Sequence, residues 1–68
     1  MRSSILSKRE LEIFNKLILN KTTKEIGIDL QISEKTVRNH ISNVIQKLGV
    51  KDRSNAIIEL IKLGEIKI

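Results

Sequence analysis

Residues 22–48 decide the fold, and they read TTKEIGIDLQISEKTVRNHISNVIQKL. Apolar residues here recur at intervals of three and four, which is the spacing of amphipathic helices, and the period-two alternation of a half-buried strand is not sustained. The capping residues Thr22 and Ser33 predict one helix over residues 23–30 and a second over residues 34–48. These two helices are the centre of the expected structure.

Gln31, Ile32 and the cap Ser33 are the only residues between the two expected helices. A three-residue turn between a short and a longer helix is the spacing of a helix-turn-helix, in which the second helix projects one face outward while the first supports it. Gly27 lies inside the first helix, where glycine costs about 1 kcal/mol relative to alanine. Close approach of the backbone to another helix would explain a glycine there.

Two further helices flank this pair. A capping box that begins at Ser7 predicts a helix over residues 8–19. Asp52 as the cap and Gly64 as the closing residue predict another over residues 53–63. The expected fold is therefore all-α, with four helices.

The whole chain of 68 residues is expected to form a single domain with residues 1–6 as an N-terminal tail. A chain this short buries only about 60% of its unfolded surface and is marginally stable alone. It has no cysteine and one histidine, so neither disulfides nor a zinc site is expected to stabilise it. Self-association is the stabilising factor that we expect instead. With no apolar run of membrane-spanning length and no signal peptide, a cytoplasmic location is expected.

The formal net charge is +5 and the isoelectric point is about 9.9. This excess favours an anionic partner, although many small domains are basic without binding nucleic acid. Residues 33–53 hold five basic and two acidic residues, whereas the remainder holds eight and six. The positive excess therefore lies around the second central helix.

The outer face of that helix carries the candidate base-contacting side chains. An α-helix fits the major groove of B-DNA, where Arg38 can form two hydrogen bonds to guanine, Asn39 can pair with adenine and Ser42 can contact either. Lys35 and Gln46 extend the row. Any amphipathic helix has a polar outer face, but a merely solvated one is usually rich in Glu and Lys, and the abundance of Asn, Ser and Gln here favours base contact.

The amino end of the same helix suits a phosphate, because free amides and a partial positive charge lie there. Lys35, Thr36 and His40 stand nearby. For His40 a hydrogen bond to phosphate and a purely structural role both remain open. Lys24 and Thr23 open the preceding helix, and for each of them a phosphate contact and a solvated side chain remain open.

Ile58 and Ile61 make the last helix apolar on a second side, beyond its core positions. In so small a chain this pair favours a two-fold interface between copies of the helix. The alternative is packing against the first helix or against the tail, which carries Ile66 and Ile68.

Other functional classes fit the sequence less well. An enzyme is not expected, because clustered carboxylates, a glycine-rich phosphate loop and a nucleophile with its base are all absent. An RNA binder lacks a stacking platform, since the single aromatic residue, Phe14, lies on a core stripe. No helix has the Lys/Arg-rich face of a membrane binder. A protein-interaction module that uses the apolar faces of the last helix and tail remains an alternative.

Five motifs in this order resemble the LuxR-type helix-turn-helix family, and above all its stand-alone members that regulate late sporulation genes. The resemblance covers residues 6–68. The motifs are LSKRELEIF at 6–14, KTTKEI at 21–26, ISEKTVRNHISN at 32–43, KLGVKDRSNAI at 47–57 and LGEIKI at 63–68.

The resemblance implies a four-helix DNA-binding domain that forms a homodimer through the last helix, with Ile58 and Ile61 at the interface. It implies a transcription regulator of late sporulation (spore-coat) genes, acting as activator or repressor by its position on a promoter. Double-stranded DNA is then the partner, RNA polymerase a second candidate, and no cofactor, metal or small-molecule ligand is expected.

Matching positions carry site residues across the resemblance. Base contacts are implied for Arg38, Asn39 and Ser42. Phosphate contacts are implied for Thr23, Lys24, Lys35, Thr36, His40 and Lys47. Gly27 departs from the family pattern, in which alanine is usual, and is expected to loosen its helix. Many relatives carry a receiver or ligand-sensing domain upstream, and without one, control through the amount of protein is expected.

Overall fold

The computed structural model describes residues 5–67, and these contain four helices and no strand. The helices are α1 (Lys8–Leu17), α2 (Thr23–Leu30), α3 (Glu34–Leu48) and α4 (Arg53–Lys62). The all-α prediction is confirmed, and α2 and α3 have the expected bounds. The first helix ends two residues earlier than expected and the last ends one residue earlier.

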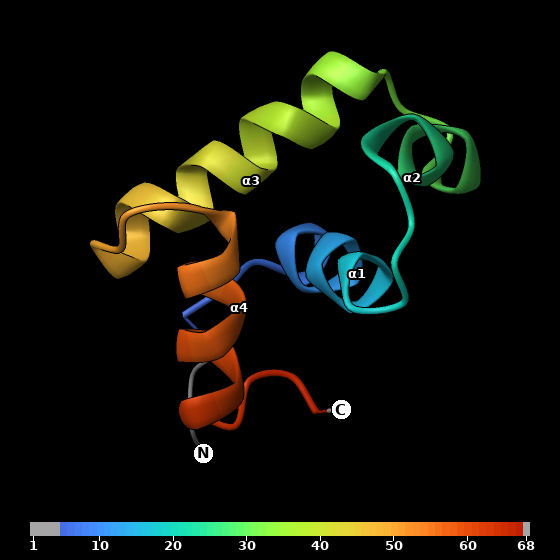
Figure 1. Ribbon diagram of the computed structural model, residues 1–68. Coiled ribbons are helices and arrows are strands. Elements are labelled where there is room, and N and C mark those ends of the chain that lie inside the picture. The colour runs from blue at the N-terminus through green and yellow to red at the C-terminus, as the bar shows by residue number, and fades with distance from the viewer. Residues whose placement is uncertain (1–4, 68) are drawn as a thin grey trace.

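The longest helix, α3, organises the molecule (Figure 1). It crosses α1, while α2 packs near its amino end and α4 near its carboxyl end. All three neighbours lie on the same side of α3 in this view, and no other helix of residues 5–67 covers its opposite side. The described residues extend over 30 × 27 × 19 Å.

Each helix begins at a side-chain cap that the sequence predicts. Ser7 Oγ accepts from the Glu10 N–H at 3.1 Å, and the Glu10 carboxylate accepts from the Ser7 N–H at 2.9 Å. Thr22 and Glu25 form the same reciprocal pair at the start of α2. Caps of this kind satisfy amides that the first helical turn leaves without partners. Ser33 and Asp52 cap the other two helices.

All four helices of the described residues end in the same hydrogen-bonded turn, in which a backbone N–H donates to the carbonyl five residues earlier. The residue before that N–H is left-handed in every case: Asn20, Gln31, Gly49 and Gly64. In α1 this turn places Asn20 at φ 65° and bonds the Lys21 N–H to the Lys16 carbonyl, so the helix stops at Leu17 and not at residue 19. The same turn in α4 makes Leu63 its cap.

Gly27 is fixed by the close approach of the turn that follows α2. A Cβ at this position would lie 2.8 Å from the Ile32 carbonyl oxygen, which is shorter than real Cβ contacts. The Ile32 N–H also bonds to the Gly27 carbonyl at 2.9 Å. The glycine thus allows the turn to close tightly against α2. The expectation that Gly27 loosens this helix did not take into account the close contact between Gly27 and the turn.

The core lies between α1, α3 and α4, and it is closed by α2, by Leu6 before α1 and by Ile66 after α4. Phe14 and Ile13 of α1 are fully buried at its centre. Phe14 is the residue that the sequence pattern places on a core stripe, and Ile13 is buried beside it, whereas Leu11 and Ile18 are only half-buried. The other buried apolar residues are Leu6, Leu17, Ile26, Val37, Ile41, Val44, Ala56, Leu60 and Ile66.

The segment expected to be an N-terminal tail contributes to this packing where it is described, because Leu6 is buried. Residues 1–4 and Ile68 lie outside the described residues.

Candidate nucleic-acid interface

The polar face of α3 is open to solvent along its length. The three expected base-contacting residues, Arg38, Asn39 and Ser42, are all exposed. Lys35, Asn43 and Gln46 on the same face are exposed as well. Residues 35 and 46 are about 16 Å apart along the helix at 1.5 Å per residue. A continuous polar stripe of this length on an uncovered helix can enter a groove wide enough for an α-helix.

The amino end of α3 brings together several of the expected phosphate contacts. Lys24 and Lys35 are exposed, at the first turns of α2 and α3. The Thr36 hydroxyl lies 2.8 Å from the Ser33 hydroxyl, and the Thr36 N–H donates to the same oxygen. His40 is half-buried one turn further along. These side chains sit on two helices whose amino ends both favour anions.

Glu34 joins the two helices of the helix-turn-helix at this end. Its Oε2 accepts from the Thr23 hydroxyl at 2.7 Å and from the Arg38 guanidinium at 2.8 Å. An expected phosphate contact and an expected base contact therefore share one carboxylate oxygen. The Glu34–Arg38 pair could have been read from its spacing of four residues. The Thr23 contact depends on how the two helices cross.

A second carboxylate, that of Glu10, joins α1 to the carboxyl end of α3. Glu10 Oε1 accepts from Lys47 Nζ at 2.6 Å, and Lys47 Nζ also donates to the Ile5 carbonyl at 3.2 Å. The Glu10 side chain is 6% exposed and that of Lys47 is 37% exposed. Lys47, an expected phosphate contact, thus uses two of its three donors within the protein. One N–H remains to contact a phosphate.

The pKa of Glu10 is below its ordinary value. Burial by itself would raise this pKa, but the hydrogen bond and charge of Lys47, with the hydrogen bonds from Ser7, outweigh the burial and lower it. Glu10 is therefore a charged group at neutral pH inside the protein. From the sequence, Glu10 is only the acidic residue of the capping box that begins at Ser7.

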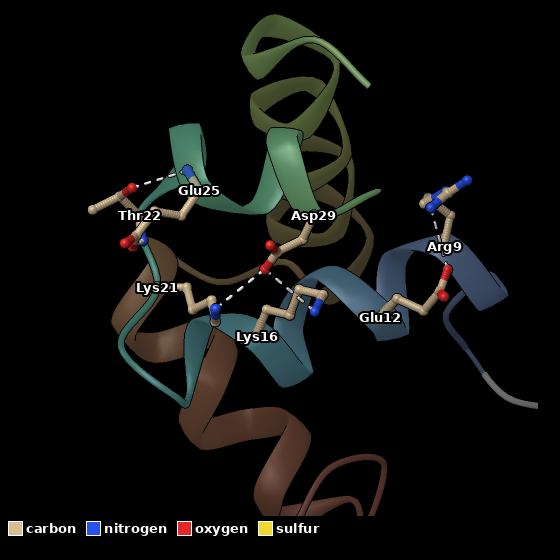
Figure 2. Close-up of polar contacts among 7 residues, drawn as sticks. All are labelled: Arg9, Glu12, Lys16, Lys21, Thr22, Glu25 and Asp29. Atoms are coloured by element: carbon tan, nitrogen blue, oxygen red, sulfur yellow. Dashed lines mark hydrogen bonds and ion pairs between the residues drawn. The ribbon is translucent and has the colours of Figure 1, made fainter. Parts of the chain in front are cut away.

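A smaller ionic contact fixes α2 against α1. Asp29 of α2 lies 3.2 Å from Lys21 Nζ and 3.5 Å from Lys16 Nζ (Figure 2). The hydrogen bond and charge of Lys21, with those of Lys16, lower the pKa of Asp29. The contact is solvent-exposed, so it contributes little to stability.

The candidate interface on α4 is only partly free. Ile58 is 50% exposed, whereas Ile61 is partly buried against the core. Ile66 of the tail is buried in that core. Leu63, which the sequence pattern did not single out, is 40% exposed. Ile61 therefore packs partly within the subunit, as the alternative expected. Ile58 instead presents an open apolar surface.

Residues 5–67 offer no pocket, and they contain no group of three or more His, Asp or Glu side chains that could hold a metal ion. Among the same residues no helix is both long and apolar enough to cross a bilayer.

Known proteins of similar sequence and structure support the interpretation of α3 as part of a helix-turn-helix. Residues 4–60 match the family described as bacterial regulatory proteins, luxR family. The chain belongs to this luxR family. It is 61% identical over 64 residues to the spore germination protein GerE of Bacillus subtilis (strain 168), a match that covers 94% of this chain and 86% of that protein.

Other luxR-family relatives are longer. The chain is 45% identical over 64 residues to the transcriptional regulatory protein DegU of Brevibacillus brevis, and it spans 27% of the length of that protein. Among solved structures, that of the transcription factor GerE superposes with a TM-score of 0.94 at 62% identity, covering 96% of this chain and 97% of the other. The response regulator ChrA has a TM-score of 0.84 at 35% identity, with 97% and 32% covered.

This luxR-family protein is accordingly a GerE-like, DNA-binding transcription regulator and not an enzyme. Family and fold agree with the expectations from sequence. What the sequence did not reveal is the pair of carboxylates, Glu10 and Glu34, that tie the two ends of α3 to its neighbours.

Proposed function

We propose that the protein regulates sporulation genes as a homodimer that inserts α3 into the major groove of its operator. The observation that carries this proposal is the open polar face of α3 described above. The relative named spore germination protein GerE supports the physiological setting. The protein would act on chromosomal DNA in the cytoplasm, and RNA polymerase bound at the same promoter would be its second partner.

In this proposal Arg38, Asn39 and Ser42 contact bases and so discriminate between sequences. Contacts to phosphate supply most of the affinity without discriminating. We assign them to Lys24, Lys35, Thr36, His40 and Lys47, and to the backbone N–H of Thr23, whose single hydroxyl proton is donated to Glu34. The formal net charge of +5 supports an affinity of largely electrostatic origin.

Selection of bound sequences from a random pool of duplex DNA tests this function directly. The expected result is a single preferred motif with two-fold symmetry. Enrichment of no motif would overturn sequence-specific recognition. If the dimer contacts about 6–10 phosphates, binding to the selected duplex should weaken by about 10³–10⁵ between 50 and 200 mM salt. A gel shift that does not occur even at low salt would instead favour a protein-interaction module.

The homodimer would form through the exposed apolar surface of α4 that includes Ile58. Ile58→Asp should give a monomer in sedimentation experiments, because each copy would place a charge at the two-fold contact. Adding Ile61→Asp should strengthen the effect, although part of Ile61 packs in the core. The matched control is Leu19→Asp with Ile28→Asp, which charges two residues 70% and 69% exposed outside α4. A dimer that survives Ile58→Asp would rule out this interface.

A further inference from the structure

We propose that Glu34 is a specificity-determining positioning residue, which holds the Arg38 guanidinium in place for base contact through a carboxylate that Thr23 in turn fixes. This inference rests on the proposed base contact of Arg38. It assigns a role to an acidic residue at the edge of a basic surface, where charge alone would disfavour binding to DNA.

The geometry shows a relay across the helix-turn-helix. Thr23 is half-buried at the start of α2, and its hydroxyl donates to Glu34 Oε2 from eleven residues away at 2.7 Å. Arg38 donates to the same oxygen at 2.8 Å. Glu34 therefore contacts a partner on another helix as well as one on its own. The contact with Thr23 restricts the rotamers of Glu34, and Glu34 in turn restricts the direction of Arg38.

The energetics exclude stability as the main effect of this contact. The side chains of Arg38 and Glu34 are 65% and 38% exposed, and exposed ion pairs contribute little to folding. A flexible arginine, by contrast, loses rotamer freedom when it binds, and a side chain that is already held in place loses less. Orientation of Arg38 before binding thus favours the one base pair that its guanidinium can reach from that direction.

Glu34 also opposes binding in general. Its negative charge stands at the amino end of α3 among the proposed phosphate contacts, where it repels every DNA sequence equally. The carboxylate therefore lowers affinity for all duplexes while it raises discrimination at one position. These two effects have opposite signs in a Glu34 variant, and this makes them separable.

The experiment compares wild-type protein with Glu34→Gln on the selected duplex and on each of its single base-pair substitutions at fixed salt. Glu34→Gln should bind random DNA more tightly. It should lose about 3- to 10-fold of its preference at the base pair that Arg38→Ala identifies, and keep its preferences elsewhere. Glu34→Ala, which removes the acceptor altogether, should lose at least as much. Thr23→Val should lose part of the same preference without a change in charge.

Glu12→Gln is the matched control. Glu12 pairs with Arg9 on α1 and its side chain is 43% exposed, so the variant removes the same charge at a similar exposure (Figure 2). It should leave the preference at the Arg38 base pair unchanged. Circular dichroism and thermal unfolding of each variant establish that it is folded before binding is compared.

A double-mutant cycle with Arg38→Ala decides between the outcomes. If Glu34 acts through Arg38, then Glu34→Gln changes no base preference once Arg38 is alanine, although the gain in general affinity persists. Preference lost at a different base pair, and lost also in the Arg38→Ala background, would make Glu34 a direct base contact and overturn the proposal. Undiminished preference in Glu34→Gln and Glu34→Ala would overturn it too. A wild-type protein that prefers no sequence would instead refute the proposed function itself.

Discussion

The two ends of α3 are each tied to a neighbouring helix by one glutamate, yet the two contacts differ in burial. At the carboxyl end Glu10 is 6% exposed and accepts from Lys47. At the amino end Glu34 is 38% exposed and accepts from Thr23 and Arg38. The hydrogen-bond lengths are similar, between 2.6 and 2.8 Å.

Burial decides what each contact contributes. A buried carboxylate that loses its cation keeps its charge where water hydrates it poorly, with only its remaining hydrogen bonds to stabilise it, so the cost falls on folding. An exposed one is rehydrated at little cost, so its loss affects only the direction of its partner side chain. The comparison assigns stability to the Glu10 end of α3 and recognition to the Glu34 end.

The largest expected effect is at the buried end. Lys47→Met should reduce the free energy of unfolding by about 2–4 kcal/mol, because Glu10 loses its cation while it stays buried. Urea unfolding at pH 7 and fixed protein concentration measures this. Lys51→Met removes the same charge from an exposed position and should cost less than about 0.5 kcal/mol. Equal losses in the two variants would contradict the assignment.

At the exposed end the expected effect is on binding. Arg38→Ala should weaken binding to the preferred duplex by about 1–3 kcal/mol and relax the preference at one base pair. Its free energy of unfolding should change by less than about 0.5 kcal/mol. Fluorescence anisotropy with labelled duplexes measures the first quantity and urea unfolding the second. A uniform loss over all sequences would make Arg38 a phosphate contact.

Lowering the pH should reduce the stability that the Glu10–Lys47 contact contributes. The loss should be smaller than in Lys47→Met, because a protonated Glu10 leaves no buried charge without its cation. The pKa of Glu10 is lower in the folded protein than its ordinary value of 4.5, so its contribution to stability is complete above that pH. It is lost as the pH falls through the folded pKa. Unfolding measured from pH 6 downward should therefore show a shallower decline in Glu10→Gln than in the wild type. Parallel declines would show that Glu10 is not the group responsible.

The smallest expected effect lies just before the amino end of α3, at the turn that positions Glu34. Gln31 has φ 59°, a left-handed conformation that glycine adopts without the Cβ penalty. Gln31→Gly should raise the free energy of unfolding by about 0.5–1 kcal/mol. Thermal unfolding tests this, with Gln46→Gly inside α3 as a control that should be destabilising by about 1 kcal/mol. A loss of stability in Gln31→Gly would show that the turn is not strained.

Much of the fold was predictable because helix caps are local. The bounds of α2 and α3 follow from Thr22 and Ser33 together with the spacing of apolar residues. The end of α1 was predicted too late because Leu19 is apolar and fits the helical period, although the helix ends at Leu17 and Leu19 lies in the turn that the left-handed Asn20 completes. Leu19 is in fact 70% exposed.

The candidate nucleic-acid interface on α3 was predictable only as a set of residue types on one face of that helix. The pattern placed Arg38, Asn39 and Ser42 on that face, and all three are exposed. It gave no sign that Thr23 would contact Glu34, or that Lys47 would be engaged by Glu10. A helical wheel describes one helix at a time, and these contacts join two.

The sequence by itself determined the four helices, the polar face of α3 and the positive charge around it, because caps, periodicity and charge depend on residues at most a few positions apart. Only the tertiary structure decided that Glu34 meets a hydroxyl eleven residues away and that Glu10 meets an ammonium group thirty-seven residues away. Those pairings depend on the angles at which α1 and α2 cross α3. Crossing angles result from the packing of the whole core and are encoded in no single stretch of the chain.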